Sequence, residues 1–381
     1  MGEKGSTASA TIRIAQASAK SIPDINYYDV MPQKPATIKE IAKQLKVSVS
    51  TVSRALHDHP SIGLRTKMQV QKLAQELNYE PNQAAISFKQ GKTNTIGLIL
   101  PNLGEEFFSI AINGIEDAAI RNSYTVLIGQ SRDDMQREIQ IADTMRKHRV
   151  DGLLVSLAKN TTSFDHFDQL SKYNIPVVFF DRVPDDAAAY TVSCDLKNSS
   201  ELLVDWLVQQ GHTAIGFIKG PDTMPSTLER MQGYFAGLKK NGLPVNEAFV
   251  VATDLDRENT KAAVKKLLKL KNRPTALIAF NDYVALDAMK FIRSEGLEIN
   301  KDISIVSYAN LPVTSYLDSP PVASIEQFPY QQAEKAATLL LELIGRKEDM
   351  PATIEKKIVL KPELVTHPEQ RGRAVKKSRK Q

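Results

Sequence analysis

The residues best suited to chemical recognition in this chain stand in the string VSVSTVSRAL, residues 47–56. Ser, Thr and Val are mediocre helix formers, yet the flanking residues are strongly helical in character. Ser48 is a good N-cap for a short helix through Leu56 or His57, which keeps Val52 and Leu56 inward. The first turn of this helix would expose small side chains, so that its backbone could approach a partner closely.

The exposed side chains of this helix have the chemistry needed to read DNA. A serine hydroxyl such as that of Ser50 bonds bases or phosphates, and Val49 can meet a thymine methyl group. Arg54 can form two hydrogen bonds with guanine. The N-terminal residues of such a helix, including Thr51, lie against base edges in the major groove. The alternative is a helical bundle that binds no DNA, in which Arg54 is only a solvated charge.

Two further helices would hold this one in place. The segment TIKEIAKQL has one apolar face and begins with the capping box of Thr37 and Glu40. The segment TKMQVQKLAQELN repeats the apolar pattern and ends before a proline. The apolar positions of the two helices are Ile38, Ile41, Ala42, Leu45, Val70, Leu73, Ala74 and Leu77. Helices joined by a turn as tight as the one before Ser48 form a helix-turn-helix, which we expect over residues 36–80.

The charges are divided unevenly along the chain, although the formal net charge is only +5. Residues 36–92 hold nine Lys and Arg against four Asp and Glu, and residues 367–381 hold six against one. Residues 93–366 hold 30 against 36. A basic amino-terminal module on an acidic body indicates a polyanionic partner for the module alone. Small charge excesses are also common in proteins without such partners, and this alternative stays open.

From residue 93 onward, short β-branched runs alternate with amphipathic stretches of about 12–16 residues. The runs are TIGLILP, TVLIGQ, DGLLVSL, VVFFD, AIGFIKG, FVVATDL, ALIAFND and ISIVSYA. Alternation of strands and helices predicts parallel sheets that are covered on both faces. So many strands would overfill one typical domain, which favours two lobes with doubly wound sheets.

The sequence gives no indication of an enzyme or of a cofactor site. The six histidines lack metal-ligand spacing, and there is no HExxH, no GxGxxG after a strand and no Gly-x-Ser-x-Gly elbow. The single cysteine, Cys194, excludes a disulfide framework and a cysteine-based metal site. No run approaches transmembrane length and no signal-peptide core is present, so we expect a cytoplasmic protein without a membrane partner.

Polar residues follow several of the predicted strands of the body. These residues are Asn102, Asp181, and Asn281 with Asp282. Ligands of doubly wound sheets bind beyond the carboxyl ends of the strands, so we expect the polar residues to converge in a cleft between the lobes. Phe107 and Phe108 would add an apolar wall, and such a set suits a polyhydroxylated small molecule. The alternative for each Asp or Asn is a helix N-cap, which the same positions favour.

Taken together, these features resemble one known family. Residues 37–93, with VSxxTVSRAL followed by LNYEPN, closely resemble the DNA-binding head of the lac repressor family. The body resembles the effector domain of that family, which is akin to periplasmic sugar-binding proteins, and the resemblance covers residues 36–366. It implies an all-α helix-turn-helix head and a two-lobed, periplasmic-binding-protein-like α/β effector domain.

The resemblance implies DNA contacts at particular positions. The residues that would face the major groove are Val49, Ser50 and Arg54. The residues that would hold phosphates or sugars are Thr37, Ser48, Thr51, Ser53 and Asn82. The segment PNQAAISF, which includes Ala85, would be a hinge helix with Phe88 as its minor-groove wedge, unless Phe88 is merely packed. Lys46 replaces the glycine of the turn, where a positive φ would cost on the order of 1 kcal/mol.

The resemblance also assigns residues to an effector site. It adds Arg230, where the family has an arginine that clamps the effector, to the polar residues that follow the strands. At the position of Ala309 the family commonly has an aspartate that holds ligand hydroxyls, and Asn310 or Gln327 would have to compensate for it. An arginine without that aspartate favours an anionic ligand, such as a sugar acid or a sugar phosphate, over a simple neutral sugar.

The sequence thus predicts a homodimeric transcriptional regulator that binds a pseudo-palindromic double-stranded operator. We expect this regulator to be a repressor. A small-molecule effector, a sugar or sugar derivative, would change the spacing or order of the hinge helices through lobe closure. The rival prediction is a small-molecule-binding or sugar-processing protein with a non-functional head, in which Arg54→Ala changes nothing.

The sequence also predicts the domain boundaries. We expect a disordered extension at 1–35, the head at 36–80, the hinge helix and linker at 81–93, the body at 94–366 and a basic disordered tail at 367–381. Within the body, lobe 1 would comprise about 94–193 and 329–357, and lobe 2 about 194–328 and 358–366.

Overall fold

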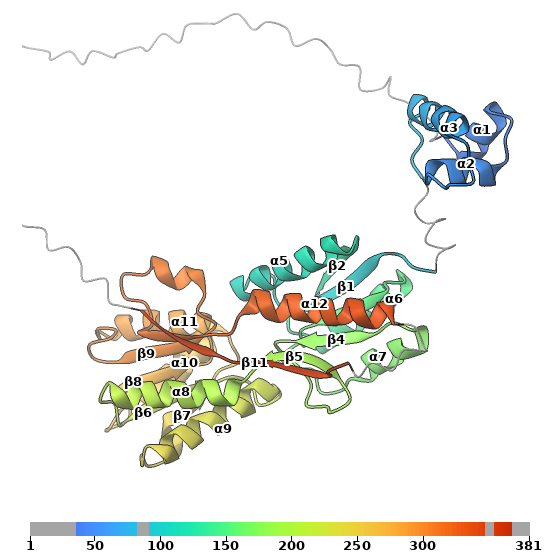
Figure 1. The fold of residues 1–381 in the computed structure, drawn as a ribbon. Coiled ribbons are helices and arrows are strands. Elements are labelled where there is room, and N and C mark those ends of the chain that lie inside the picture. Colours follow the sequence, from blue (N-terminus) through green and yellow to red (C-terminus); the bar gives the residue numbers. More distant parts are fainter. Residues whose placement is uncertain (1–35, 82–90, 347–353, 368–381) are drawn as a thin grey trace, which may run out of the picture. The chain divides into compact units, whose positions relative to one another are not determined.

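The computed structural model of the chain describes residues 36–81, 91–346 and 354–367 (Figure 1). These residues form two compact units, which we call the head, residues 36–81, and the body, which begins at residue 91. Each unit is described separately below. The expectations that lie outside the described residues concern the extension 1–35, the hinge helix with Asn82, Ala85 and Phe88, and the tail beyond His367.

The described residues of the head form three helices around a small apolar core. The helices are α1 (Ile38–Gln44), α2 (Val49–Leu56) and α3 (Leu64–Glu76). Thr37 and Glu40 form the predicted capping box, and the Ser48 hydroxyl accepts a hydrogen bond from the backbone N–H three residues on, at 3.0 Å. Val52 is fully buried and Leu56 packs against the core, which confirms the predicted inward face of α2. Because a core of this size buries little apolar area, such caps contribute a large share of the stability.

The turn between α1 and α2 has a backbone conformation that glycine adopts most readily. Lys46 lies in the left-handed region with a φ of 53°, as expected from its place in the turn. The N–H of Val47 donates to the carbonyl oxygen of Ala42 at 3.0 Å and closes the turn. A lysine in this region costs on the order of 1 kcal/mol. The packing of α2 against its two neighbours must exceed that cost.

Within the described residues the body contains two six-stranded sheets. The strand order is β11-β5-β4-β3-β1-β2 in the first sheet and β12-β10-β9-β8-β6-β7 in the second. We call the first sheet with its covering helices lobe 1, and the second sheet with its helices lobe 2. The strands are β1 (Thr95–Leu100), β2 (Thr125–Gln130), β3 (Gly152–Val155), β4 (Val177–Phe180), β5 (Tyr190–Cys194), β6 (Ile215–Lys219), β7 (Val250–Ala252), β8 (Ala276–Ala279), β9 (Ser304–Tyr308), β10 (Ala323–Glu326), β11 (Lys357–Leu360) and β12 (Glu363–Thr366).

Helices cover both faces of each sheet, as the alternating pattern predicts. They are α5 (Glu106–Arg121), α6 (Met135–Lys147), α7 (Asp165–Asp168), α8 (Leu196–Gln209), α9 (Pro225–Lys240), α10 (Arg257–Leu268), α11 (Asp282–Ser294) and α12 (Pro329–Gly345), with the short 3₁₀ turns η1 (Gln169–Tyr173), η2 (Glu247–Phe249) and η3 (Pro312–Tyr316). In lobe 1, α5 and α12 pack on one face, and α6 and α7 on the other (Figure 1). In lobe 2, α10 and α11 lie opposite α8 and α9. This arrangement follows from the strand pleat, because successive side chains of a strand point to opposite faces of the sheet. In β1, Leu98 packs in the core with α5 and α12, and Ile99 packs in the core with α6 and α7.

All eight strands expected from the sequence are present, but β5, β10, β11 and β12 were missed. The predicted parallel sheets are confirmed, and one edge strand departs from the parallel arrangement. Strand β12 runs antiparallel to β10, with Ala323 opposite Thr366, whereas the other pairings between named strands are parallel. An antiparallel strand at the edge of an otherwise parallel sheet needs only a short connection from β11, so the chain can end there without another crossover helix.

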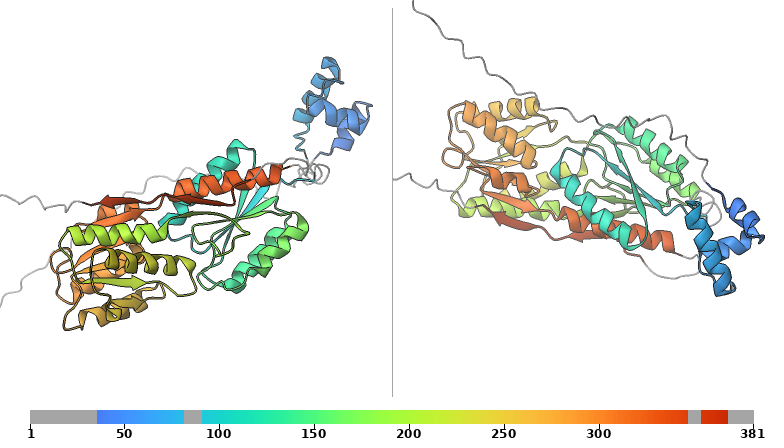
Figure 2. Two further views of the ribbon diagram at one scale, coloured as in Figure 1. Left: turned by 60° about the horizontal axis from the view of Figure 1, so that its bottom comes forward. Right: turned by 90° about the horizontal axis from the view of Figure 1, so that it is seen from above.

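In its described part the chain passes between the lobes three times. It leaves lobe 1 after β5, returns from lobe 2 after β10, and crosses once more between β11 and β12. Figure 2 shows the C-terminal strands in red, extending along both halves of the body. Three connections let one lobe rock against the other around a shared hinge, while neither lobe is a separate stretch of chain.

The position of α9 in lobe 2 depends on a glycine. A Cβ atom at Gly233 would lie 2.0 Å from the carbonyl oxygen of Lys197 and 2.7 Å from Cβ of Ser200, both on α8. No side chain fits in that space, so glycine is required for the two helices to pack this closely. The close packing of α9 also fixes Arg230, which lies one turn before Gly233.

Candidate functional site

The exposed face of α2 carries the residues for which base contacts were expected. Val49, Ser50 and Arg54 are exposed, and Val49 is 42% exposed although it is apolar. Ser50 and Arg54 are four residues apart and therefore lie on the same side of the helix. Thr51 and Ser53 are half-buried. The face thus presents methyl groups, a hydroxyl and a guanidinium to solvent.

Hydroxyl groups gather at the beginning of α2. Ser48 Oγ is 2.7 Å from Ser50 Oγ and 2.8 Å from Thr51 Oγ1. Thr37 lies at the corresponding position of α1, where it caps the helix. The N-terminus of a helix carries a partial positive charge and unpaired N–H groups, which favour phosphate oxygens. The structure therefore places Thr37, Ser48 and Thr51 at helix starts, where phosphate contacts are most readily made.

A cavity of about 40 Å³ lies between the two lobes of the body. Its lining residues are Glu105, Phe107, Phe108, Asp181 and Arg182 from lobe 1, Met224, Ser226, Arg230, Phe280, Asn281, Tyr283, Ala309 and Leu311 from lobe 2, and Gln327 after β10. The structure thus brings together six of the residues expected at the effector site, namely Phe107, Phe108, Asp181, Arg230, Asn281 and Gln327. The volume corresponds to roughly one water molecule.

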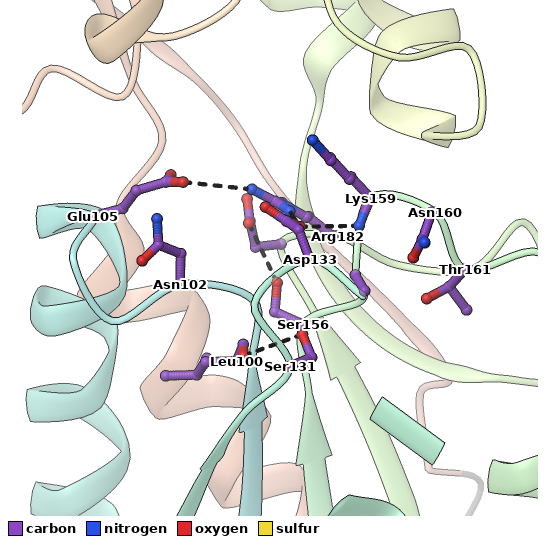
Figure 3. A network of polar contacts seen from close by, with 12 residues as sticks. Leu100, Asn102, Glu105, Ser131, Asp133, Ser156, Lys159, Asn160, Thr161 and Arg182 are labelled. Atoms are coloured by element: carbon purple, nitrogen blue, oxygen red, sulfur yellow. Dashed lines mark hydrogen bonds and ion pairs between the residues drawn. The ribbon is translucent and has the colours of Figure 1, made fainter. Parts of the chain in front are cut away.

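The lobe 1 side of the cavity is a network of ion pairs around Arg182 (Figure 3). The Arg182 guanidinium is 2.5 Å from Asp133 Oδ1 and 3.9 Å from a carboxylate oxygen of Glu105. Asp133 Oδ1 also accepts a hydrogen bond from the Lys159 N–H at 3.0 Å. Burial lowers the pKa of Arg182, but the surrounding carboxylates together hold that pKa above its ordinary value. Arg182 is therefore a fully charged part of the scaffold.

The lobe 2 side of the cavity holds a second buried arginine in a different environment. Arg230 is 5% exposed, and its Cζ lies 4.2 Å from the ring centre of Phe280 and 4.6 Å from that of Tyr308. Its Nε has no hydrogen-bond partner among the described residues. Burial is the main reason that the pKa of Arg230 is lowered. A buried N–H without an acceptor is rare, and here it lies beside a cavity where a ligand would supply one.

The two acidic residues that line the cavity are Asp181 and Glu105, and both have raised pKa values. Burial raises the pKa of Asp181, while Arg182 and Arg230 counteract that effect. Burial likewise raises the pKa of Glu105, and Arg182 opposes the shift. The cavity thus has a carboxylate acceptor in lobe 1 and a guanidinium donor in lobe 2. A hydroxyl group can donate to the first and accept from the second.

Asn281 has both of the roles considered for it, lining the cavity and capping a helix. It lines the cavity, and its Oδ1 accepts a hydrogen bond from the Val284 N–H at 2.9 Å, which caps α11. Asn102 is not among the cavity-lining residues. Its Oδ1 accepts a hydrogen bond from the Gly104 N–H at 2.9 Å, and its side chain lies beside Glu105 (Figure 3). Asn102 therefore contacts the network and not the cavity.

Asn310 and Asp282 are not brought to the cavity. The Nδ2 of Asn310 donates to Glu326 Oε2 at 2.9 Å, and its Oδ1 is 2.9 Å from His367 Nε2. The backbone explains this orientation, because Ala309 and Asn310 have left-handed φ angles and the Asn310 side chain lies outside the cavity that Ala309 and Leu311 line. The expectation that Asn310 compensates for the absent aspartate has no support from its position, whereas Gln327 lines the cavity.

The sequence interpretation missed several residues of the cavity. Arg182 and Tyr283 stand one and two residues after Asp181 and Asn281, so the rule that ligands bind beyond strand ends could have identified them. Glu105 had no comparable signal, because it comes from the loop before α5 and acts through Arg182, which is distant in the sequence. Asp133, which pairs with Arg182, also had no signal in the sequence, because the two residues are distant along the chain.

Direct contacts between the lobes surround the cavity. Lys159 Nζ of lobe 1 is 2.9 Å from Asp254 Oδ2 of lobe 2. The Glu106 N–H donates to the Tyr283 hydroxyl at 3.0 Å, and the Glu106 carboxylate accepts a hydrogen bond from the Val313 N–H at 3.1 Å. These contacts hold the lobes together around this cavity and around an adjoining one of about 290 Å³, which shares Arg182, Met224 and Ser226 with it.

The described residues contain no group of three or more His, Cys, Asp or Glu side chains that could hold a metal ion. None of the helices described in this structure is both long enough and apolar enough to cross a membrane. Burial raises the pKa of Cys194 to about 12, so this thiol is protonated at neutral pH and a poor nucleophile. The chemistry assembled around the cavity consists of hydrogen-bond donors, acceptors and aromatic surfaces.

Two family models match the chain. The model of bacterial regulatory proteins of the lacI family matches residues 37–82, and that of periplasmic binding proteins and the sugar binding domain of the LacI family matches residues 93–363. The HTH-type transcriptional repressor CytR of Escherichia coli (strain K12) is 33% identical over 307 residues, which cover 81% of this chain and 89% of that protein. The HTH-type transcriptional repressor PurR of Aliivibrio salmonicida (strain LFI1238) is 30% identical over 332 residues, with coverages of 87% and 98%.

The fold has solved counterparts as well. The lac repressor dimer bound to operator and the anti-inducer ONPF superposes with a TM-score of 0.76 and 24% identity, over 87% of this chain and 98% of that one. At this identity the likeness concerns the fold, which comprises the same head and two-lobed body. Because one family model covers most of the body, a second covers the head, and two repressors match at 30% identity or more over four fifths of the chain, this protein belongs to the LacI family of bacterial regulatory proteins.

Proposed function

We propose that this protein is a homodimeric transcriptional repressor that binds a pseudo-palindromic operator and responds to a small hydroxylated effector. The observation that carries the proposal is the exposed face of α2. Arg54 and Ser50 lie on one side of a helix whose other side is anchored in the core of the head. A helix with this division fits the major groove, and Arg54 is its strongest candidate for reading a base.

The remaining DNA contacts belong to the same proposal. Val49, which is exposed, would meet a thymine methyl, and the hydroxyls of Thr37, Ser48, Thr51 and Ser53 are the candidates for phosphate contacts. Two heads of a symmetric dimer would read two half-sites, which is why the operator is expected to be pseudo-palindromic. The relatives CytR and PurR are named as transcriptional repressors, and this supports repression over activation here.

The body offers a surface for a second copy of the chain. Ile120 of α5 is 71% exposed, and Leu127 and Ile128 of the neighbouring edge strand β2 are each 37% exposed. An exposed apolar edge strand is prone to uncontrolled association unless another surface covers it. The fold is shared with a lac repressor that is a dimer in its solved complex, which supports coverage by a second body.

The effector proposed for the interlobe cavity is a neutral polyhydroxylated molecule. Asp133 and Glu105 already neutralise Arg182, so Asp181 and Arg230 are left as one acceptor and one donor on opposite walls. This balance favours hydroxyl groups over an anion and revises the anionic ligand considered from the sequence. Binding would favour one arrangement of the two lobes over another, and operator affinity would change through the difference between the two lobe states.

The DNA part of the proposal is tested by selecting bound duplexes from a random pool at a fixed, near-physiological salt concentration. Enrichment of a palindrome is expected. Each bidentate arginine–guanine contact contributes about 1–3 kcal/mol, so Arg54→Ala should weaken the selected duplex at least about tenfold and relax one position in each half-site. If wild-type protein that is folded enriches no sequence, the head does not read DNA and the rival function, ligand binding alone, is favoured.

A matched control separates base reading from general attraction. Lys72 on α3 is an exposed residue of the head that forms an ion pair with Glu76 at 3.8 Å. Lys72→Ala removes the same charge as Arg54→Ala but lies outside the proposed reading face. It should weaken binding to all duplexes by a similar small factor and leave the selected sequence unchanged.

The effector part is tested with thermal shifts on a panel of neutral sugars, sugar acids and sugar phosphates. Stabilisation by neutral sugars, lost in Arg230→Met, supports the proposed hydroxylated effector. A preference for sugar acids or phosphates would instead support the anionic ligand. The same compounds are then added to the operator complex, where the effector must change affinity for the selected duplex.

A further inference from the structure

Asp282 is a buried carboxylate that the proposed effector contacts do not use. It is the first residue of α11, it has no solvent exposure, and it does not line the cavity although its neighbour Asn281 does. Its carboxylate instead accepts hydrogen bonds from three groups of the adjacent strand ends. Oδ2 accepts from the Leu311 N–H at 2.6 Å, and Oδ1 accepts from Ser324 Oγ at 3.2 Å and from Ser307 Oγ.

These bonds hold a turn with an unusual backbone. Ala309 has a φ of 98° and Asn310 a φ of 50°, both in the left-handed region that favours glycine. The Asn310 N–H donates to Ser324 Oγ at 3.0 Å, and Ser324 in turn is bound to Asp282. Consecutive left-handed residues other than glycine persist only where neighbouring groups hold them in place. Asp282 is the group that connects the start of α11 with this turn.

The turn is part of the cavity wall. Ala309 and Leu311 both line the cavity, opposite Phe107 and Phe108 of lobe 1. Asn281, which also lines it, is joined covalently to Asp282. One buried carboxylate thus fixes the spacing between two separate parts of the lobe 2 wall, the cap of α11 and the turn after β9. A shift of that turn would move Ala309 and Leu311 toward or away from the space that the ligand needs.

We propose that Asp282 is a positioning residue of the effector cavity, which holds the Ala309–Leu311 turn against the start of α11. The proposal rests on the proposed function only in taking the cavity as the effector site. The rival explanation is a general one, in which Asp282 stabilises lobe 2 as a whole and has no particular relation to the turn. The two explanations differ in where the structure loosens when the carboxylate is removed.

The charge state of Asp282 follows from the groups that face it. Burial raises its pKa to about 6, while the Leu311 N–H, the hydroxyls of Ser307 and Ser324 and the nearby His367 act in the opposite direction. At neutral pH the carboxylate is therefore ionised and acts as acceptor for all three donors.

The test is amide hydrogen exchange of the full-length protein, measured by mass spectrometry at pH 7. Asp282→Ala should speed exchange of the amides of Asn310 and Leu311 by about tenfold, the effect of losing one hydrogen bond. Amides of β8, in the same lobe, should change by less than about twofold. Asp282→Asn should lie near the wild type, because its carbonyl oxygen can still accept from Leu311 while its NH₂ donates to the two serine hydroxyls, which can rotate to accept.

Two further variants make the outcome decisive. Asp287→Ala removes another carboxylate of α11, one that pairs with Arg257 at 3.0 Å and does not touch the turn, so the turn amides should not change. If Asp282→Ala does not fold, Ser324→Ala takes its place and should speed exchange at Asn310 alone. Equal acceleration throughout lobe 2, or no acceleration at the turn, would overturn the proposal. The measurement needs neither DNA nor effector, so its failure is distinct from failure of the proposed function.

Discussion

The two walls of the cavity each hold a buried arginine, and the two are bound in opposite ways. Arg182 in lobe 1 is 2.5 Å from Asp133 and 3.9 Å from Glu105. Arg230 in lobe 2 lies between the rings of Phe280 and Tyr308, and within the described residues its Nε has no hydrogen-bond partner. Both side chains are hidden from solvent, yet only the first has its charge neutralised by neighbouring carboxylates.

The difference separates a residue that supports the site from one that is available to a ligand. Removing a guanidinium from between two carboxylates leaves their charges uncompensated, so Arg182 contributes to folding. Removing the Arg230 guanidinium from beside the two rings has two opposite effects on stability. The loss of a desolvated charge stabilises the fold, and the loss of the cation–π contacts destabilises it. Lobe 1 therefore keeps its shape without a ligand, whereas the lobe 2 wall carries unused hydrogen-bonding capacity.

The largest expected effect is the loss of stability in Arg182→Met. Asp133 and Glu105 would lose their cation, and breaking a buried pair in this way costs about 3 kcal/mol or more. Urea unfolding of the full chain measures it. Adding Asp133→Asn and Glu105→Gln to the same variant removes the unpaired charges and should restore part of the loss. A change below about 1 kcal/mol would show that the network is not the support that the comparison assigns to it.

The second effect concerns the buried carboxylate that holds the lobe 2 wall. The folded-state pKa of Asp282 is raised to about 6 from an ordinary value of 3.8, so folding favours its protonated form. The contribution of protonated Asp282 to the free energy of unfolding is therefore fully present below pH 3.8, and it is lost as the pH rises through 6. Because asparagine does not ionise, the wild type should lose about 2–3 kcal/mol relative to Asp282→Asn between pH 4 and pH 7. Denaturation at several pH values tests this, with Asp287→Asn as the control that shows no such difference.

A smaller effect is expected where the two walls meet. The Lys159–Asp254 ion pair joins the lobes, but Asp254 is 56% exposed, so solvent screens it. Lys159→Met should weaken lobe closure by about 0.5–1 kcal/mol, and the difference should vanish in 1 M salt. Small-angle scattering of the body reports the change in its radius. Lys301→Met, which breaks a surface pair within lobe 2, should leave the radius unchanged.

The smallest change in stability is expected for Arg230→Met. Loss of the cation–π contacts and relief of the buried, unpartnered guanidinium should offset each other to within about 1 kcal/mol. The same urea series that is used for Arg182→Met measures it. Stabilisation by neutral sugars should nevertheless disappear in this variant. A loss of about 3 kcal/mol would mean that both arginines are scaffold and that the comparison between the walls fails.

The head was predictable from sequence because its determinants are local. The capping box, the Ser48 cap and the apolar spacing each involve residues within one or two turns of helix, and all three are present in the structure. The eight strands with continuous apolar runs were also found, since burial on both faces leaves a clear signature. The four missed strands are no shorter than several that were found, but β11 and β12 contain Lys357 and Glu363, so neither a run nor a strict alternation stands out.

The site was predictable only where position along a strand determines it. Asp181 and Asn281 follow strands and reach the cavity, as the rule for doubly wound sheets requires. Asn310 also follows a strand, but the left-handed turn at Ala309 directs it elsewhere. No single-residue pattern reveals that turn, because Ala309 is not a glycine and is held by Asp282 from another element. The ion pairs of Arg182 likewise depend on the tertiary fold and leave no trace in the local sequence.

The three crossings between the lobes bear on how the protein is made. Lobe 1 begins with β1 but obtains α12 and its edge strand β11 only from residues 329–360, after nearly all of lobe 2 has been synthesised. A growing chain on the ribosome can therefore complete neither lobe until residues 357–366 have emerged, and the early strands must wait with exposed edges. The head, whose contacts are all local, can fold long before that. During translation the nascent chain thus carries a finished head ahead of an unfinished body.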